Sequence, residues 1–222
     1  MIISFAGTDG SGKSTVSRLV GRRLAERGLP LDHVDRWDIV DNPAFPAVRF
    51  MRPDVPDARQ CVAEMPGTPR FLFLMWSISM ALLGREPAAA GRRPVLLDGY
   101  WMKHAASEIV YGLDERWVES VVAGLPPADC TLYLRATPET AWSRKAGRDV
   151  VPYECGADES CSREAFLDHQ YRIREVLDGW AGRFGWVRVD ADREVDEVAD
   201  QCAALTFGLL DAREGALTGA AP

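Results

Sequence analysis

The sequence predicts an α/β domain built on a parallel sheet. Short apolar runs of strand length alternate along the chain with longer segments in which apolar residues recur at helical spacing. The first apolar run leads into a glycine-rich loop, and a helical segment follows that loop directly. The 222 residues, 47% of them hydrophobic, suffice to bury one core. We expect one domain over residues 1–212 and a disordered tail over 213–222.

The first half of the chain contains three of the predicted strands. Apolar residues cluster in short runs over 1–6, 31–37 and 94–100, as in buried strands of a parallel sheet. Between these runs, apolar residues recur every three or four positions from Val16 to Gly28 and again over 70–83. We expect a helix in each of these two segments.

The second half continues the alternation but includes one polar segment. Helices are expected around 102–111 and 114–123, and Thr137-Pro138-Glu139 has the form of a helix start with proline at the first helical position. The polar stretch without periodicity predicts a mobile lid over about 144–161. The remaining expected elements are strands over 130–136 and 186–190 and helices over 166–180 and 194–210.

Charge and hydropathy exclude two classes of partner. The formal net charge is -7 and the pI is about 5.1, which disfavours nucleic-acid binding because that relies on clustered Lys and Arg. No apolar stretch approaches the roughly 20 residues that span a bilayer, and the first five residues are too short for a signal peptide. We expect a soluble cytoplasmic protein without membrane contacts.

Five cysteines occur at irregular spacing. A zinc site at Cys155 and Cys161 needs two further ligands, and none is nearby. Cys130 and Cys202 lie in apolar-periodic segments, where reduced thiols pack as small hydrophobes. We therefore interpret the set as structural, with neither a metal nor a disulfide at Cys155 and Cys161.

The glycine-rich loop carries the most specific motif of the chain. Residues 7–14 match G-x-x-x-x-G-K-[ST] in full, between a predicted strand and a predicted helix. In such a P-loop, backbone amides surround phosphates, Lys13 reaches the β- and γ-phosphates, and the Ser14 hydroxyl binds Mg²⁺. The alternative is an incidental glycine-rich turn, but such a turn does not require a strand before it and a helix after it. The predicted nucleotide-binding residues are Gly7, Asp9, Gly10, Ser11, Gly12, Lys13, Ser14 and Thr15.

A carboxylate follows the third predicted strand. Asp98 ends the apolar run Val95-Leu96-Leu97, where a magnesium-binding carboxylate is expected near the P-loop. The alternative is that Asp98 caps the helix that follows. We predict that Asp98 and Ser14 hold the metal.

Taken together, these motifs resemble the thymidylate kinase family over residues 1 to about 200. The resemblance rests on Gly-x-Asp-Gly-x-Gly-Lys-Ser, on Asp98-x-Tyr100 and on a basic lid after a Pro-Glu-opened helix. It implies a five-stranded parallel sheet with helices on both faces, ATP and Mg²⁺ as cofactors, and a nucleoside monophosphate as acceptor. It also implies that Asp9 faces the acceptor sugar, that Asp98 and Tyr100 lie at the substrate, and that the long helices form a homodimer.

The lid supplies basic candidates for catalysis. Arg144, Lys145 and Arg148 follow the Pro-Glu-opened helix and are able to neutralise charge on the transferred phosphoryl group. Family members with glycine at the position of Gly10 rely on the lid for this role. We select Arg148 first and Arg144 second. The alternative is that these are solvated charges at a helix end.

Two positions depart from the family pattern at the acceptor site. Relatives carry arginines that bind the acceptor where this chain has Gly99 and Ser77. A guanidinium suits phosphate well, so both losses put an ordinary thymidylate acceptor in doubt. The candidates for compensation are Arg36, Arg70 and Lys103.

Asp35 supports a second interpretation. Related deoxynucleoside kinases place an acid after the second strand as general base, and Asp35 occupies that place, although a turn residue would fit equally well. The leading hypothesis is an ATP-dependent nucleoside monophosphate kinase. The alternatives are a kinase for a nucleoside or other small hydroxyl compound, and a nucleotide-binding switch. The switch lacks support, because the chain has no Asn-Lys-x-Asp run and no Asp-x-x-Gly motif after the third predicted strand.

Overall fold

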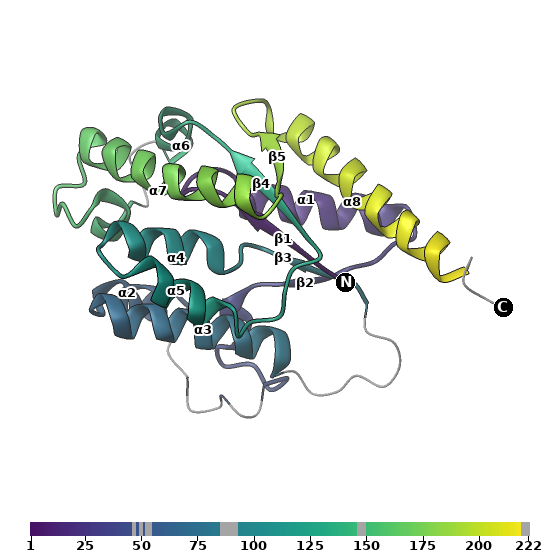
Figure 1. The fold of residues 1–222 in the computed structure, drawn as a ribbon, viewed down its shortest axis with the longest axis horizontal. Helices are drawn as coiled ribbons and strands as arrows, with labels where there is room; N and C mark the ends of the chain where they lie inside the picture. Colours follow the sequence, from purple (N-terminus) through teal and green to yellow (C-terminus); the bar gives the residue numbers. More distant parts are fainter. Residues whose placement is uncertain (46–47, 49–50, 52–54, 85–92, 146–149, 219–222) are drawn as a thin grey trace.

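A sheet of five parallel strands forms the centre of the protein (Figure 1). The computed structural model describes residues 1–45, 48, 51, 55–84, 93–145 and 150–218. The strand order is β2-β3-β1-β4-β5, which confirms the predicted α/β fold. The strands are β1 (Ile2–Ala6), β2 (Asp32–Val34), β3 (Val95–Leu97), β4 (Cys130–Arg135) and β5 (Val187–Asp190).

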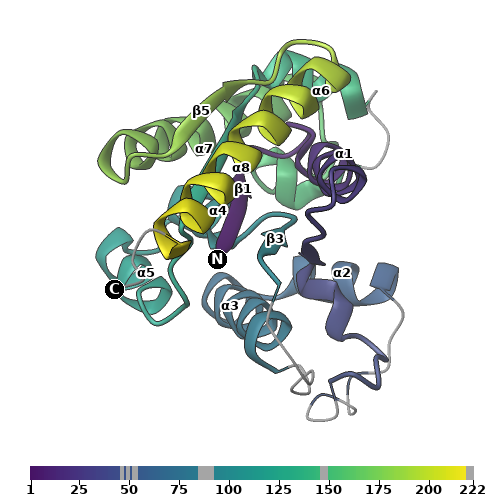
Figure 2. The same ribbon diagram turned by 90° about the vertical axis from the view of Figure 1, so that its right-hand side faces the viewer.

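Helices cover both faces of this sheet, as Figures 1 and 2 show. Alternate residues of each strand point to opposite faces. Ile3 and Phe5 of β1 pack with α1 and α8, whereas Ala6 belongs to the core beneath α3, α4, α5 and α7. The helices are α1 (Lys13–Glu26), α2 (Val55–Glu64), α3 (Gly67–Leu83), α4 (Trp101–Val110), α5 (Glu115–Val122), α6 (Pro138–Lys145), α7 (Arg163–Arg183) and α8 (Val195–Thr218).

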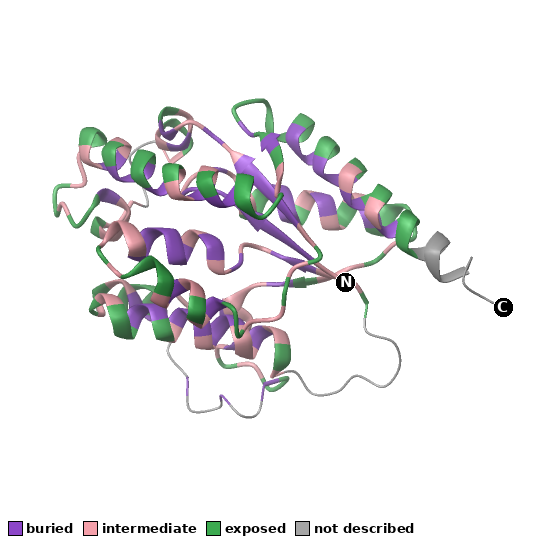
Figure 3. Ribbon diagram, in the orientation of Figure 1, coloured by how far each residue is buried: buried purple, intermediate pink, exposed green. Residues whose placement is uncertain are grey.

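The burial pattern explains why these helices form. In Figure 3 the strands are largely buried, while the outer helices alternate between buried and exposed residues along their length. Such amphipathic helices gain stability mainly by packing one apolar stripe on the sheet. None of the described helices combines the length and the apolar character needed to cross a membrane.

Element boundaries differ from prediction in three places. The second strand stops at Val34, because Asp35 and Asp38 form reciprocal caps that start the short 3₁₀ helix η1 (Arg36–Ile39). Helix α2 was not predicted, since its short apolar pattern is weak. Helix α8 continues to Thr218, into the segment expected to be a disordered tail.

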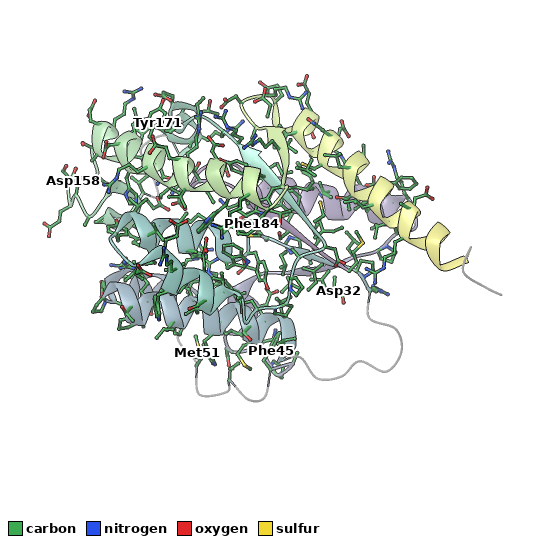
Figure 4. All side chains as sticks on the ribbon, in the orientation of Figure 1. Asp32, Phe45, Met51, Asp158, Tyr171 and Phe184 are labelled. Atoms are coloured by element: carbon green, nitrogen blue, oxygen red, sulfur yellow. A yellow bond between two sulfur atoms is a disulfide. The ribbon has the colours of Figure 1, made fainter. Side chains whose placement is uncertain are left out.

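The expectation of reduced cysteines in the lid was wrong. Cys155 and Cys161 form a disulfide, with Cα atoms 5.3 Å apart. Gly156, Ala157 and Cys161 all have positive φ, and these residues turn the chain back so that the two thiols meet. Another 3₁₀ helix, η3 (Pro152–Cys155), lies in this loop, and Figure 4 places Asp158 at the outer end of the loop.

The sheet register gathers functional segments at one edge. Ser4 and Val34 are both aligned with Leu97, so the loops after β1, β2 and β3 leave the sheet side by side. Ligands of open parallel sheets bind beyond these carboxyl ends. The P-loop, Asp35 and Asp98 therefore lie together.

Candidate functional site

A cavity of about 870 Å³ opens at the carboxyl edge of the sheet. The P-loop forms its floor, and the segments after β2, β3 and β5 form its walls together with α2, α4 and the end of α6. The cavity brings together most of the predicted site. Its lining includes Asp9, Gly10, Ser11, Gly12, Lys13, Ser14, Thr15, Asp35, Arg36, Asp98, Tyr100, Lys103 and Arg144.

At two glycines of the P-loop, the backbone passes close to the backbone of neighbouring elements. A Cβ on Gly7 would lie 2.7 Å from the Leu134 carbonyl oxygen, and one on Gly10 would lie 2.7 Å from that of Ala141. Gly10 also has a φ of 75°, which side chains disfavour. The loop therefore turns over the end of β1 only because these positions lack side chains.

Lys13 lies back on its own loop in this structure. Its Nζ donates to the carbonyl oxygens of Gly7 at 2.9 Å and Thr8 at 2.7 Å. Burial lowers the pKa of Lys13 to about 8, although the Asp9 carboxylate opposes this change. Incoming phosphate oxygens are able to replace the two carbonyls as acceptors.

Asp9 and Lys103 form an ion pair inside the cavity. The distance from Asp9 Oδ1 to Lys103 Nζ is 2.9 Å, and each side chain is 12% exposed. Burial raises the pKa of Asp9, but the ammonium groups of Lys103, Lys13 and Lys145 outweigh burial and lower it to about 2. Asp9 is thus ionised, and Lys103 lies beside the P-loop.

Asp98 faces the cavity and does not cap the next helix. The N-cap of α4 is Tyr100, which lacks a side-chain capping bond. Asp98 Oδ1 is buried and has no hydrogen-bond partner within the described part of the chain. An orphaned carboxylate oxygen near Ser14 fits Mg²⁺, which takes few protein ligands and fills its shell with phosphate oxygens and water. The described residues include no cluster of three or more His, Cys, Asp or Glu side chains suited to a metal.

The cavity lining also contains two residues that sequence reasoning missed. Arg59 of α2 and His104 of α4 line the cavity together with Arg36. Burial, followed by the charge of Arg36, lowers the pKa of His104 well below its usual value, and its Nδ1 lacks a partner among the described residues. Arg59 escaped notice because α2 was not predicted.

Two predicted acceptor residues have other roles in the fold. Arg70 does not line the cavity: its Nη2 donates to Glu108 Oε2 at 3.0 Å, its Nε pairs with Oε1, and its guanidinium lies 4.4 Å from the centre of the Tyr153 ring. Tyr100 lines the cavity, but its hydroxyl donates to the Pro126 carbonyl oxygen. Both depend on tertiary partners that sequence spacing does not reveal.

The positions that lack family arginines have structural explanations. Gly99 has a φ of 78°, a conformation in which any side chain would be strained. Ser77 is fully buried, and its hydroxyl donates to the Leu74 carbonyl oxygen within α3. In this backbone, therefore, neither position presents a guanidinium to the cavity.

The remaining predicted site residues are Asp35 and the lid cations Arg144, Lys145 and Arg148. The Asp35 carboxylate accepts from the Trp37 amide at 2.7 Å, so it serves as a cap while lining the cavity. Arg144 lines the cavity and donates to the Arg193 carbonyl oxygen at 3.0 Å. Lys145 pairs with Glu154 of the lid. Arg148 lies outside the described residues.

The sheet order and the P-loop define the chain as a P-loop nucleotide-binding protein, and the relatives that it matches are kinases. No family model matches the sequence. A thymidylate kinase of Chlorobaculum tepidum is 30% identical over 184 residues, covering 79% of this chain and 81% of that protein. The chain belongs to the thymidylate kinase family.

A further relative agrees with this assignment, and a solved structure shares the fold. A probable thymidylate kinase 2 of Saccharolobus solfataricus is 33% identical over 110 residues, covering 47% of this chain and 52% of that relative. The structure of deoxyadenosine kinase from M. mycoides with bound dCTP has a TM-score of 0.56 and 16% identity, over 96% of this chain and all of that one. The latter likeness supports the fold.

We predict that Arg70 stabilises the fold and does not bind the acceptor. Arg70→Met leaves the fully buried Glu108 carboxylate uncompensated, which costs about 3–5 kcal/mol of unfolding free energy. Urea unfolding measures this loss, and Arg22→Met, at an exposed position of α1, is the control. Unchanged stability together with a raised acceptor KM would contradict this assignment.

Proposed function

We propose that the protein transfers the γ-phosphoryl group of ATP to a nucleoside monophosphate, with Mg²⁺ as cofactor. The observation that carries this proposal is the lining of one cavity. The P-loop lines it, and so do the cations Arg36, Arg59 and Lys103, of which Lys103 is paired with Asp9 of the P-loop. The same cavity therefore offers a loop for the donor triphosphate and further cations for an anionic acceptor.

The donor half follows from the P-loop. Backbone amides of residues 10–14 and the start of α1 would surround the phosphates, and Lys13 would exchange its loop carbonyls for phosphate oxygens. Ser14 and Asp98 would hold Mg²⁺, which supplies charge neutralisation at the phosphates when bound. Arg144 and Arg148 would stabilise charge on the phosphoryl group during transfer.

The acceptor half follows from the cations that line the cavity beside the P-loop. Arg36 Nε is buried and lacks a partner in the described chain, so it is available to an acceptor phosphate. His104 Nδ1 is available in the same way for a polar group of the acceptor. Asp9, fixed by Lys103, would orient the sugar. Positioning of this kind supplies most of the catalysis in phosphoryl transfer.

A second candidate function is phosphorylation of a nucleoside or another small hydroxyl compound. The absence of guanidinium groups at Gly99 and Ser77 favours it, and Asp35 lies in the cavity where it would accept a proton. The cationic pair Arg36 and Arg59 would then bind a different acidic group. The buried Arg36 Nε gives the monophosphate the stronger support.

We also infer a homodimer formed through α3. Leu72 and Leu83 of this helix are 46% and 58% exposed, beside the partly buried Phe73 and Trp76. An apolar strip of this kind is typical of an interface between copies of a chain.

Changing the phosphate and metal residues tests the donor half. Lys13→Ala removes the charge at the transferred group and lowers kcat about a thousandfold. Asp98→Asn shifts the Mg²⁺ concentration needed for half-maximal rate by about 10–100-fold. Steady-state assays over a magnesium series measure both effects. Near-normal activity in both variants would refute the site assignment, and unchanged circular dichroism shows that they fold.

Changing Arg59 tests the acceptor half. Arg59→Ala raises the acceptor KM about tenfold while the ATP KM stays constant, because one charge-assisted contact to the acceptor is lost. Arg22→Ala removes an exposed arginine that does not line this cavity and is the matched control. Equal acceptor KM values for both variants would exclude Arg59 from the acceptor site.

A further inference from the structure

The side chain of Gln170 joins the P-loop to the lid loop, which we define as residues 150–162. Gln170 lies on α7 and is fully buried. Its Oε1 accepts from the Asp9 amide at 3.1 Å, and its Nε2 donates to the Glu154 carbonyl oxygen at 2.9 Å. Nε2 also lies 3.5 Å from Asp9 Oδ2. One amide group thus contacts both segments.

We propose that Gln170 is a positioning residue that fixes the P-loop acid Asp9 relative to the lid loop. This inference rests on the proposed function, in which Asp9 orients the acceptor. The Asp9 carboxylate contacts Lys103 through Oδ1 and faces Gln170 with Oδ2, so the two partners together set its orientation. Contact with Lys103 alone would leave the carboxylate group of Asp9 free to rotate.

The surroundings of Gln170 connect it to the cavity from the lid side. Glu154, whose carbonyl oxygen receives the Gln170 bond, forms an ion pair with Lys145 through its carboxylate. Lys145 lines the cavity at the end of α6. The disulfide partner Cys155 follows Glu154 directly, which restrains the lid loop at this point. A shift of the lid loop would therefore reach Asp9 through the Gln170 side chain.

A purely structural role for Gln170 would require only that its side chain fill space in the core. Helix α7 already packs into the core through Ile173, Leu177 and Trp180, which are almost fully buried. Only a side chain with both a donor and an acceptor makes the contacts to Asp9 and to Glu154 together. Packing alone would accept an apolar residue of similar length without kinetic consequences.

Three variants of the full-length protein separate these roles. Gln170→Met keeps the length but removes all three contacts. Gln170→Glu keeps the acceptor for the Asp9 amide, loses the donor and places a second carboxylate beside Asp9. Ile173→Val, one turn along the same helix, lowers stability without touching the P-loop and is the control.

We expect the Gln170 variants to impair use of the acceptor while leaving ATP binding nearly unchanged. Gln170→Met lowers kcat/KM for the acceptor about tenfold while the ATP KM changes less than about twofold, because the P-loop amides and Lys13 remain in place. Gln170→Glu has at least the same effect, because repulsion is added. Ile173→Val leaves both parameters unchanged. Equal kinetics for Gln170→Met and Ile173→Val would overturn the proposal.

Hydrogen exchange of the nucleotide-free protein gives an answer that does not need an acceptor. In Gln170→Met, amides of residues 8–11 and of residues 153–158 exchange faster together, whereas Ile173→Val does not single out these segments. Unchanged exchange in both segments would overturn the link even in an active enzyme. Failure of the proposed function shows itself separately, as absence of acceptor turnover by the unsubstituted protein.

Discussion

The close approach of the P-loop to β4 is the constraint on which the site depends. The Gly7 backbone passes so near the Leu134 carbonyl oxygen that a side chain at Gly7 would collide with it. This path directs the loop over the end of β1, and Lys13 begins α1 directly beyond it. Because β3 lies next to β1 in the sheet, the same path sets Lys13 beside the end of β3, where Asp98 emerges, and the end of β2 with Asp35 lies one strand further out.

Charge balance within the cavity follows from this arrangement. Asp9 lies among Lys13, Lys103 and Lys145, which keep it ionised despite burial. In turn, burial makes the Lys13 ammonium easier to deprotonate, so its interaction with Asp9 matters for keeping it charged. The P-loop contributes Asp9 and Lys13, α4 contributes Lys103, and the end of α6 contributes Lys145. The site is therefore assembled by tertiary contacts around a motif that is local in sequence.

Local signals made the fold and the position of the P-loop predictable. The strands and long helices have clear periodicity, and residues 7–14 form a contiguous motif whose geometry is fixed by its glycines. The acceptor half depends on contacts between distant residues. Arg70 has the chemistry of a phosphate ligand, but Glu108 of another helix binds it. Cys155 and Cys161 meet because three intervening or terminal residues adopt positive φ, and Gln170 has no sequence signature at all.

The most direct test of the central claim is an ATP-consumption screen with Mg²⁺ against nucleoside monophosphates and the matching nucleosides, with products identified by mass. The cationic pair Arg36 and Arg59 in the cavity predicts that a monophosphate is converted to a diphosphate while the matching nucleoside is not a substrate. Phosphorylation of nucleosides or other uncharged hydroxyl compounds, with no diphosphate formed from any monophosphate, would contradict the account.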